Sequence, residues 1–135
     1  MRIDLLTLFP EFFASPLSQS MLHRAQVQGA VTYTVINLRD FTTDRHQVTD
    51  DRPFGGGPGM VMKIEPLVAA IREVKGRDPE TRVILMGPGG AAFNQAKARE
   101  LAGKSHLLLI CGHYEGVDGR IHFYIDEELS IGDYI

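Results

Sequence analysis

The stretch "TRVILMGPGGAAFNQAKARELAGKSHLLLIC", residues 81–111, decides the fold class. Its two ends, "TRVILMG" and "HLLLIC", are short apolar runs typical of buried strands, and "NQAKARELAG" between them has the composition of a helix. Continuously apolar strands that alternate with helices are typical of a parallel sheet covered on both faces. The stretch therefore predicts one strand–helix–strand unit of an α/β fold.

The sequence on either side extends this pattern. Further strands are predicted in "RIDLLTLF" (2–9), "VTYTVINL" (31–38) and, as a short fifth strand, "IHFYID" (121–126); further helices are predicted from an N-cap at Ser15 to a stop at Gly29, and in "EPLVAAIREVKG" (65–76). We expect residues 1–135 to form one α/β domain, with a mostly parallel sheet and helices on both of its faces. Residues 39–62 show neither the hydrophobic period of a helix nor that of a strand. A loop of this length is usually functional or disordered.

Composition narrows the class of protein. The chain has 135 residues and a net charge of −3, and its longest apolar run, Leu107–Cys111, is far too short to span a bilayer. The N-terminus lacks the features of a signal peptide and the chain has a single Cys, so we expect a cytoplasmic protein without disulfides. The end, "ELSIGDYI", is apolar and strand-like, which indicates that the domain continues beyond residue 135.

Three glycine-rich stretches are candidates for ligand binding, because ligands of α/β sheets bind beyond the carboxyl ends of the strands. In "CGHYEG" (111–116), glycines allow close backbone approach, Tyr114 can stack on a base and Glu115 can accept from a sugar hydroxyl; the alternative is a polar turn. Cys111 is interpreted as a small buried residue that ends the strand. The histidines are scattered, so no metal site is expected.

The other two stretches allow two interpretations each. In "LMGPGG" (85–90) and the residues after it, Gly87, Gly89 and Ala92 satisfy the pattern G-x-G-x-x-A, which fits a dinucleotide turn or a plain strand-to-helix turn. The stretch "DDRPFGGGPGM" (50–60) follows a segment of interleaved Arg and Asp. That region is either a solvated flexible loop or a loop that orders on a nucleic acid, with Arg on phosphates and Asp on a base edge.

Four stretches together carry a resemblance to a known family: "LTLFPEFF" (6–13), "DFTTDRHQVTDDRPFGGGPGM" (40–60), "CGHYEGVDGR" (111–120) and "DEELSIGDYI" (126–135). They resemble the bacterial tRNA (guanine-N1)-methyltransferases of the SPOUT superfamily, and the resemblance covers essentially the whole chain. It implies a trefoil-knotted α/β domain that works as a homodimer. It also implies transfer of the methyl group of S-adenosylmethionine to N1 of the guanine 3′ of the anticodon (position 37) in tRNA.

The resemblance assigns roles to individual residues. Cofactor contacts are implied for Met86, Gly87, Pro88, Gly112, Tyr114, Glu115, Gly116, Ile131, Gly132, Asp133, Tyr134 and Ile135. tRNA contacts are expected from Arg39, Arg45, His46, Asp50, Arg52, Pro58 and Gly59. The family's general base and a supporting Arg are implied to lie beyond residue 135, and Glu115 is interpreted as a support for ligand binding. Residues 1–135 alone are therefore expected to be inactive.

Two turns differ from the family's usual pattern. Gly87-Pro88-Gly89-Gly90 stands where Ser-Pro-Gln-Gly is usual, and Asp118-Gly119-Arg120 stands where Asp-Glu-Arg is usual. Two rival functions remain open from the sequence. One is a nicotinamide-dinucleotide-binding oxidoreductase domain, based on Gly87, Gly89 and Ala92, and the other is an RNA-binding module without catalysis.

Overall fold

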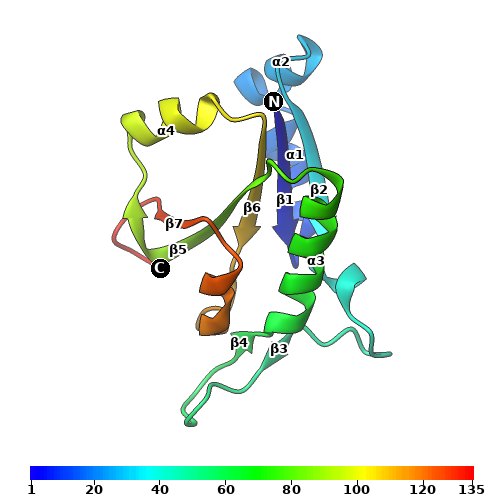
Figure 1. The fold of residues 1–135 in the computed structure, drawn as a ribbon, viewed down its shortest axis with the longest axis vertical. Coiled ribbons are helices and arrows are strands. Elements are labelled where there is room, and N and C mark those ends of the chain that lie inside the picture. The colour runs from blue at the N-terminus through cyan, green and yellow to red at the C-terminus, as the bar shows by residue number, and fades with distance from the viewer.

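A computed structural model describes all residues from 1 to 135 as one domain built on a five-stranded parallel sheet with the strand order β2-β1-β6-β5-β7 (Figure 1). The strands are β1 (Arg2–Thr7), β2 (Thr32–Asn37), β5 (Arg82–Ala92), β6 (His106–Cys111) and β7 (Glu127–Ser130), and the short antiparallel pair is β3 (Asp50–Asp51) with β4 (Val61–Met62). The helices are α1 (Ala14–Leu17), α2 (Ser20–Val27), α3 (Ile64–Arg77) and α4 (Gln95–Ala102), and the 3₁₀ helices are η1 (Pro10–Phe13), η2 (Leu38–Phe41) and η3 (Gly119–Phe123).

Helices cover both faces of the sheet, as predicted. Alternate side chains of each strand point to opposite faces, so that Val83 and Leu85 of β5 face α3 while Ile84 faces α4. The larger core lies on the α3 side and has 15 buried residues, among them Leu67 and Ile71 of the helix. On the other face, the buried cluster has four residues, one of which comes from α4. Figure 1 shows the two helices on opposite sides of the sheet.

The strand register brings three connections to one edge of the sheet. Met86 of β5 pairs with Cys111 of β6 on one side and with Leu129 of β7 on the other. Because all three strands are parallel, the bulge that follows Met86 and the segments that follow Cys111 and Ser130 lie at the carboxyl edge of the sheet. β7 pairs with β5, so the connection from β6 to β7 must pass β5. The predicted cofactor residues fall into three segments, 86–88, 112–116 and 131–135. The fold thus places these segments next to one another at one edge of the sheet.

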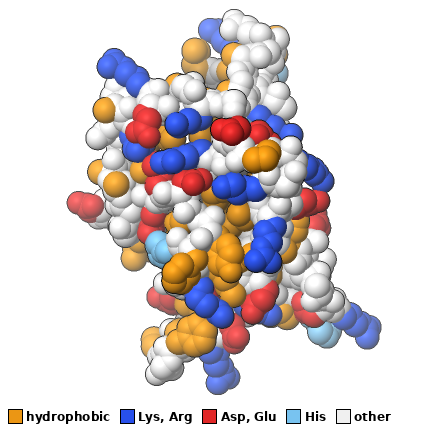
Figure 2. Space-filling view, viewed as in Figure 1, with side chains coloured by type: hydrophobic (Ala, Val, Ile, Leu, Met, Phe, Trp, Pro, Cys, Tyr) orange, Lys and Arg blue, Asp and Glu red, His pale blue; other side chains and the backbone are white.

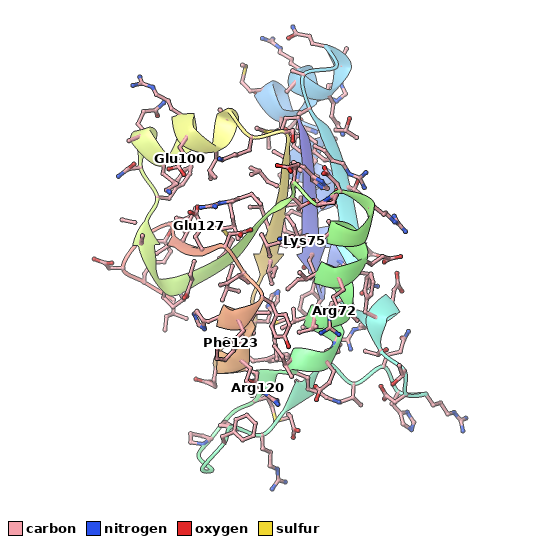
Figure 3. The ribbon with its side chains drawn as sticks, in the orientation of Figure 1. Arg72, Lys75, Glu100, Arg120, Phe123 and Glu127 are labelled. Atoms are coloured by element: carbon pink, nitrogen blue, oxygen red, sulfur yellow. The ribbon has the colours of Figure 1, made fainter.

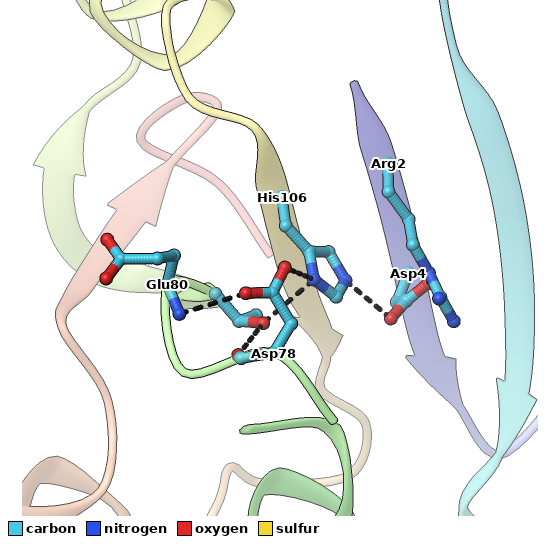
Figure 4. Close-up of polar contacts among 6 residues, drawn as sticks. Arg2, Asp4, Asp78, Glu80 and His106 are labelled. Atoms are coloured by element: carbon cyan, nitrogen blue, oxygen red, sulfur yellow. Dashed lines mark hydrogen bonds and ion pairs between the residues drawn. The ribbon is translucent and has the colours of Figure 1, made fainter. Parts of the chain in front are cut away.

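The opposite, amino edge carries a closed cluster of polar side chains (Figure 4). His106 is hydrogen-bonded through Nε2 to Asp4 Oδ2 at 2.7 Å, and through Nδ1 to Asp78 Oδ2 at 2.9 Å and Thr81 Oγ1 at 2.8 Å. Arg2 Nε donates to the other oxygen of the Asp4 carboxylate at 3.0 Å. We call Asp4, Asp78, Thr81 and His106 the clasp. It joins the starts of β1 and β6 to the segment between α3 and β5.

The predicted helix from Ser15 to Gly29 is only partly correct. The chain forms two short helices, α1 and α2, and Ser15 lies inside α1 without capping it. The break has a local cause: the Ser18 hydroxyl donates to the carbonyl of Ser15 at 2.8 Å, and Ser20 adopts a positive φ of 48°. Gly29, with a φ of 73°, ends α2 as predicted.

The predicted fifth strand at 121–126 is wrong. Asp118 caps the 3₁₀ helix η3 there by accepting a hydrogen bond from the amide of Arg120 at 3.0 Å, and the fifth strand, β7, begins only at Glu127. The 39–62 region is irregular as expected, except for η2 and the β3–β4 pair. No helix of the structure has both the length and the hydropathy that crossing a membrane requires.

The proposed dinucleotide turn at "LMGPGG" is also wrong. β5 does not stop at Gly87 but continues to Ala92, so Gly87 and Gly89 lie in an extended, bulged strand. The helix that follows, α4, is capped separately by Asn94, whose side chain accepts from the amide of Lys97 at 2.9 Å. A dinucleotide fingerprint needs a tight turn that leads directly into a helix, and neither feature is present.

Candidate functional site

The centre of the site is the bulged end of β5. The pairing of β5 with β7 shifts register between Met86 and Ala91, so residues 87–90 bulge from the ladder. A Cβ atom placed on Gly90 would lie 2.5 Å from the carbonyl carbon and oxygen of Glu128, so this position admits only glycine. A Cβ on Gly87 would instead meet the carboxylate end of the Glu128 side chain at 2.6 Å, and that side chain can move.

The segment after β6 forms one side of the site. Gly112 lies against the carbonyl oxygen of Met86, at 3.7 Å from where its Cβ would be. Tyr114 and Gly116 adopt positive φ values of 62° and 134°, which turn the chain back sharply. The side chains of Tyr114 and Glu115 are exposed. The ring of His113 packs edge-on against Phe9, with 4.7 Å between ring centroids, so the end of β1 supports this segment.

The segment after β7 forms the other side. The Ser130 hydroxyl donates to the carbonyl of Gly132 at 2.8 Å and accepts from the Gly132 amide at 3.2 Å, which turns the chain immediately after the strand. Ile131, Tyr134 and Ile135 are exposed. The structure therefore brings all three predicted cofactor segments to one edge and leaves apolar side chains of both flanking segments accessible to a ligand.

A large cavity lies away from these segments. It measures about 650 Å³ and lies between β2, the start of β1 and α3, beside the clasp. An entirely apolar groove of about 330 Å³ runs between α4 and the sheet. Of the predicted cofactor residues, Met86 and Ile131 line that groove. The three segments thus form an open edge and do not line the 650 Å³ cavity.

The seven predicted tRNA residues fall into two groups. Arg39, Arg45 and His46 belong to the segment around η2, where the Arg39 guanidinium donates to the carbonyl of Gln47 at 3.2 Å. Asp50 lies on β3, and Arg52, Pro58 and Gly59 lie on the connection between β3 and β4, residues 52–60, which we call the glycine arm. Figure 1 shows this arm projecting away from the sheet.

The glycine arm is hydrogen-bonded to the segment after β6. The amide of Glu115 donates to the carbonyl of Met60 at 2.9 Å, and the amide of Met62 donates to the carbonyl of Gly116 at 2.9 Å. A third bond runs from the Asp118 amide to the carbonyl of Met62 at 3.0 Å. Gly59 packs so closely on the side chain of Glu115 that a Cβ there would collide with it. The structure therefore joins the predicted tRNA and cofactor residues at Glu115 and Gly59.

Two charged pairs beside the site were not predicted from the sequence. The buried carboxylate of Asp118 receives Nε and Nη2 of Arg120 at 3.0 and 2.6 Å, and these hydrogen bonds lower the pKa of Asp118 and raise that of Arg120. His122 Nε2 lies 3.0 Å from Glu128 Oε2, and this hydrogen bond raises the pKa of His122. The available signal was Asp118 two residues before Arg120, a common arrangement at a helix start.

Cys111 ends β6, as interpreted from the sequence, and is half-buried there. Burial raises the pKa of its thiol to about 11, which keeps it protonated and makes it a poor nucleophile. The structure has no group of three or more His, Cys, Asp or Glu side chains arranged to hold a metal ion.

Comparison with known proteins agrees with this geometry. The family model described as tRNA (Guanine-1)-methyltransferase TrmD matches residues 1–135. The chain belongs to this family. Among its relatives, the tRNA (guanine-N(1)-)-methyltransferases of Carboxydothermus hydrogenoformans and Syntrophomonas wolfei are 54% and 53% identical over the whole chain and are covered over 53% and 54% of their own lengths. The chain thus spans about half the length of the curated relatives it matches.

A solved structure supports the fold independently. The crystal structure of the tRNA (m1G37) methyltransferase from Aquifex aeolicus superposes with a TM-score of 0.91 at 36% sequence identity, over 100% of this chain and 61% of that one. The α/β fold predicted from the sequence is confirmed, and so is the family to which the motifs pointed.

Proposed function

We propose that this chain is the cofactor-binding part of an S-adenosylmethionine-dependent tRNA (guanine-N1)-methyltransferase, which methylates the guanine 3′ of the anticodon, position 37. One observation carries the proposal: in a chain of this family, three glycine-containing segments lie at one edge of the sheet, namely the bulged end of β5 and the segments that follow β6 and β7. Relatives about 50% identical bear the name of this activity. The oxidoreductase alternative loses its basis, because its glycines lie inside a strand.

Gly112 supports the cofactor assignment. Its φ is not positive, and a Cβ there would meet only ordinary contacts, at 3.6 Å from Val117 and 3.7 Å from the Met86 carbonyl. The fold itself does not require glycine at this position. A glycine here instead leaves space that a ligand can occupy. Tyr114, Ile131 and Tyr134 would offer apolar surface to the cofactor, and Glu115 an acceptor for its ribose hydroxyls. When bound, S-adenosylmethionine supplies an electrophilic methyl group on a sulfonium.

The proposal is tested by calorimetry with the purified chain. S-adenosylmethionine should bind and NAD should not. Gly112→Val should abolish binding without lowering the melting temperature appreciably, because its Cβ fits and only the ligand's space is filled. Gly76→Val, on the exposed face of α3 with nothing within 4 Å of its Cβ, serves as the control. Undiminished affinity in Gly112→Val would show that the cofactor is placed wrongly.

Methyl transfer itself needs more than these residues. Guanine N1 carries a proton at neutral pH, and transfer requires a base to remove it. Glu115 lies within one of the proposed cofactor segments, and its place against Gly59 suits ligand support. We therefore expect residues 1–135 to transfer label from S-adenosylmethionine to tRNA at least ~100-fold more slowly than a fusion to the second half of the Carboxydothermus relative. Equal rates would indicate a base within 1–135, such as Glu115 or Asp50.

The same proposal includes tRNA as the partner, a trefoil knot, a cytoplasmic location and a homodimer. Support for self-association comes from exposed apolar side chains on η1 and α2, namely Phe12, Met21 and Val27. Light scattering on the purified chain checks the dimer, and a monomer at high concentration would count against it.

A further inference from the structure

Phe54 is a largely exposed aromatic side chain. It lies on the glycine arm and is 80% exposed, although exposing so large an apolar ring to water is unfavourable. The three residues that follow, Gly55, Gly56 and Gly57, all have positive φ, between 81° and 109°. A Cβ on any of them would meet nothing within 4 Å, so the space around this part of the arm is open.

The guanidinium of Arg120 lies over the Phe54 ring. The guanidinium carbon of Arg120 lies 5.7 Å from the ring centroid, within the range of a cation–π contact. Arg120 comes from η3 and reaches toward the arm (Figure 3). Its guanidinium plane is fixed by Asp118, which is only 6% exposed and holds two guanidinium nitrogens on its two oxygens. The ring is therefore backed on one side by a fixed cation.

The position of the ring is also fixed relative to the candidate site. The backbone hydrogen bonds that join Met60 and Met62 to residues 115, 116 and 118 hold the C-terminal end of the arm beside the segment after β6. Asp118 belongs to the same segment. This segment therefore holds both the Arg120 guanidinium and the C-terminal end of the glycine arm. On the molecular surface, hydrophobic and basic side chains lie together over the β3–β4 hairpin (Figure 2).

We propose that Phe54 is a stacking platform for one base of an RNA loop and that Arg120 is the residue that positions it. The inference rests on the proposed function, because it names a contact for that function's RNA. Unstacked RNA bases are recognised by stacking on aromatic rings, and cation–π contacts from Arg accompany such stacking. An apolar protein partner would not need a cation fixed over the ring.

Fluorescence tests the platform directly, because the chain contains no Trp. Phe54→Trp introduces a single tryptophan, whose emission should be quenched when an anticodon stem-loop RNA with the target guanine is added. Phe123→Trp is the matched control: Phe123 is 87% exposed on η3, points into solvent and should show no quenching. Quenching in both variants, or in neither while the RNA still binds, would overturn the proposal.

Affinity measurements separate the platform from a purely structural role. Phe54→Ala should weaken RNA binding on the order of tenfold to a hundredfold, whereas affinity for S-adenosylmethionine should stay within about twofold. Phe54→Tyr should keep RNA affinity because it keeps the ring face. Arg120→Ala should weaken RNA binding in the parent but add nothing in Phe54→Ala, since Arg120 acts through the ring.

The outcomes distinguish this inference from the proposed function. If the parent binds the RNA and Phe54→Ala binds it equally well, the platform is wrong and the proposed function stands. If additive losses are found for Phe54→Ala and Arg120→Ala, the positioning role of Arg120 is wrong. If the parent binds S-adenosylmethionine but no RNA even at low salt, the tRNA part of the proposed function fails, and the platform fails with it.

Discussion

The two edges of the sheet are built from the same strands and differ in what their polar groups contact. At the amino edge, Asp4, Thr81 and His106 are buried and are hydrogen-bonded to other protein groups. At the carboxyl edge, Tyr114 and Tyr134 are exposed, and the backbone is turned by glycines. The clasp at the amino edge is closed by its own hydrogen bonds, whereas the carboxyl edge leaves side chains available. This division suits an α/β sheet, whose ligands bind at the carboxyl edge.

The hydrogen bonds of the clasp hold the His106 ring on both of its nitrogens. The Thr81 hydroxyl donates its only proton to the carbonyl of Asp78 at 2.7 Å, so it can only accept from His106 Nδ1. The partner of Nε2 is the carboxylate of Asp4. Every partner of the ring is an acceptor, and the ring lies between the carboxylates of Asp4 and Asp78. Such a buried ionic cluster is costly to break at one member.

The largest effect on stability should come from His106→Ala. Removing the ring leaves the Asp4 carboxylate buried with only Arg2 as a partner, which should cost about 3 kcal/mol of unfolding free energy. Urea denaturation measures the loss. His122→Ala, an exposed histidine at the other edge, should cost less than about 1 kcal/mol.

The same variant tests whether the edges are independent. At a temperature where His106→Ala remains folded, its affinity for S-adenosylmethionine should equal that of the parent. A loss of affinity with intact folding would show that the clasp also serves the candidate site, and a loss of stability below about 1 kcal/mol would contradict the buried ionic cluster.

A smaller effect should come from Gly90→Ala, which shows that the carboxyl edge also contains a residue required by the fold. The new Cβ would lie 2.5 Å from the backbone of Glu128, so β5 and β7 must separate, at a cost of about 2 kcal/mol. Gly89→Ala is the control, because its Cβ would lie 3.5 Å from the movable carboxylate of Glu128. Thermal unfolding compares the two, and equal melting temperatures would refute the steric argument.

Gly90 also illustrates what the sequence could and could not predict. The spacing of apolar residues along the sequence identified β1, β2, β6 and α3, because the same residues form these elements in the structure. They missed the full length of β5, since "GPGGAA" has no strand pattern and is extended only because β7 pairs with its end. The sequence therefore predicted a turn where the structure has a bulge, and it could not identify Gly90 as the glycine that the fold requires.

The candidate site divides in the same way. The three segments could be named in advance, because glycines and functional side chains follow apolar runs that must be strands. The clasp could not, because His106 and Asp4 are 102 residues apart and meet only through strand pairing. The Phe54–Arg120 contact was missed for the same reason, since it depends on the arm folding onto η3. The cofactor and tRNA contacts themselves stay predictions.

The smallest effect concerns pH and the outermost member of the clasp. The hydrogen bond from His106 lowers the pKa of Asp78, and the bond from the Glu80 amide lowers it further. A carboxyl whose pKa is lower in the folded protein contributes stability above its ordinary value, near 4, and loses that contribution as the pH falls through the folded value. Because Asp78 is partly exposed, the contribution is screened by water and should be small.

Urea midpoints between pH 3 and 7 should therefore fall less steeply at acid pH for Asp78→Asn than for the parent. Glu80→Gln, whose side chain lies outside the clasp, should follow the parent. Parallel curves for Asp78→Asn and the parent would show that the clasp is held by Asp4 and Thr81 alone.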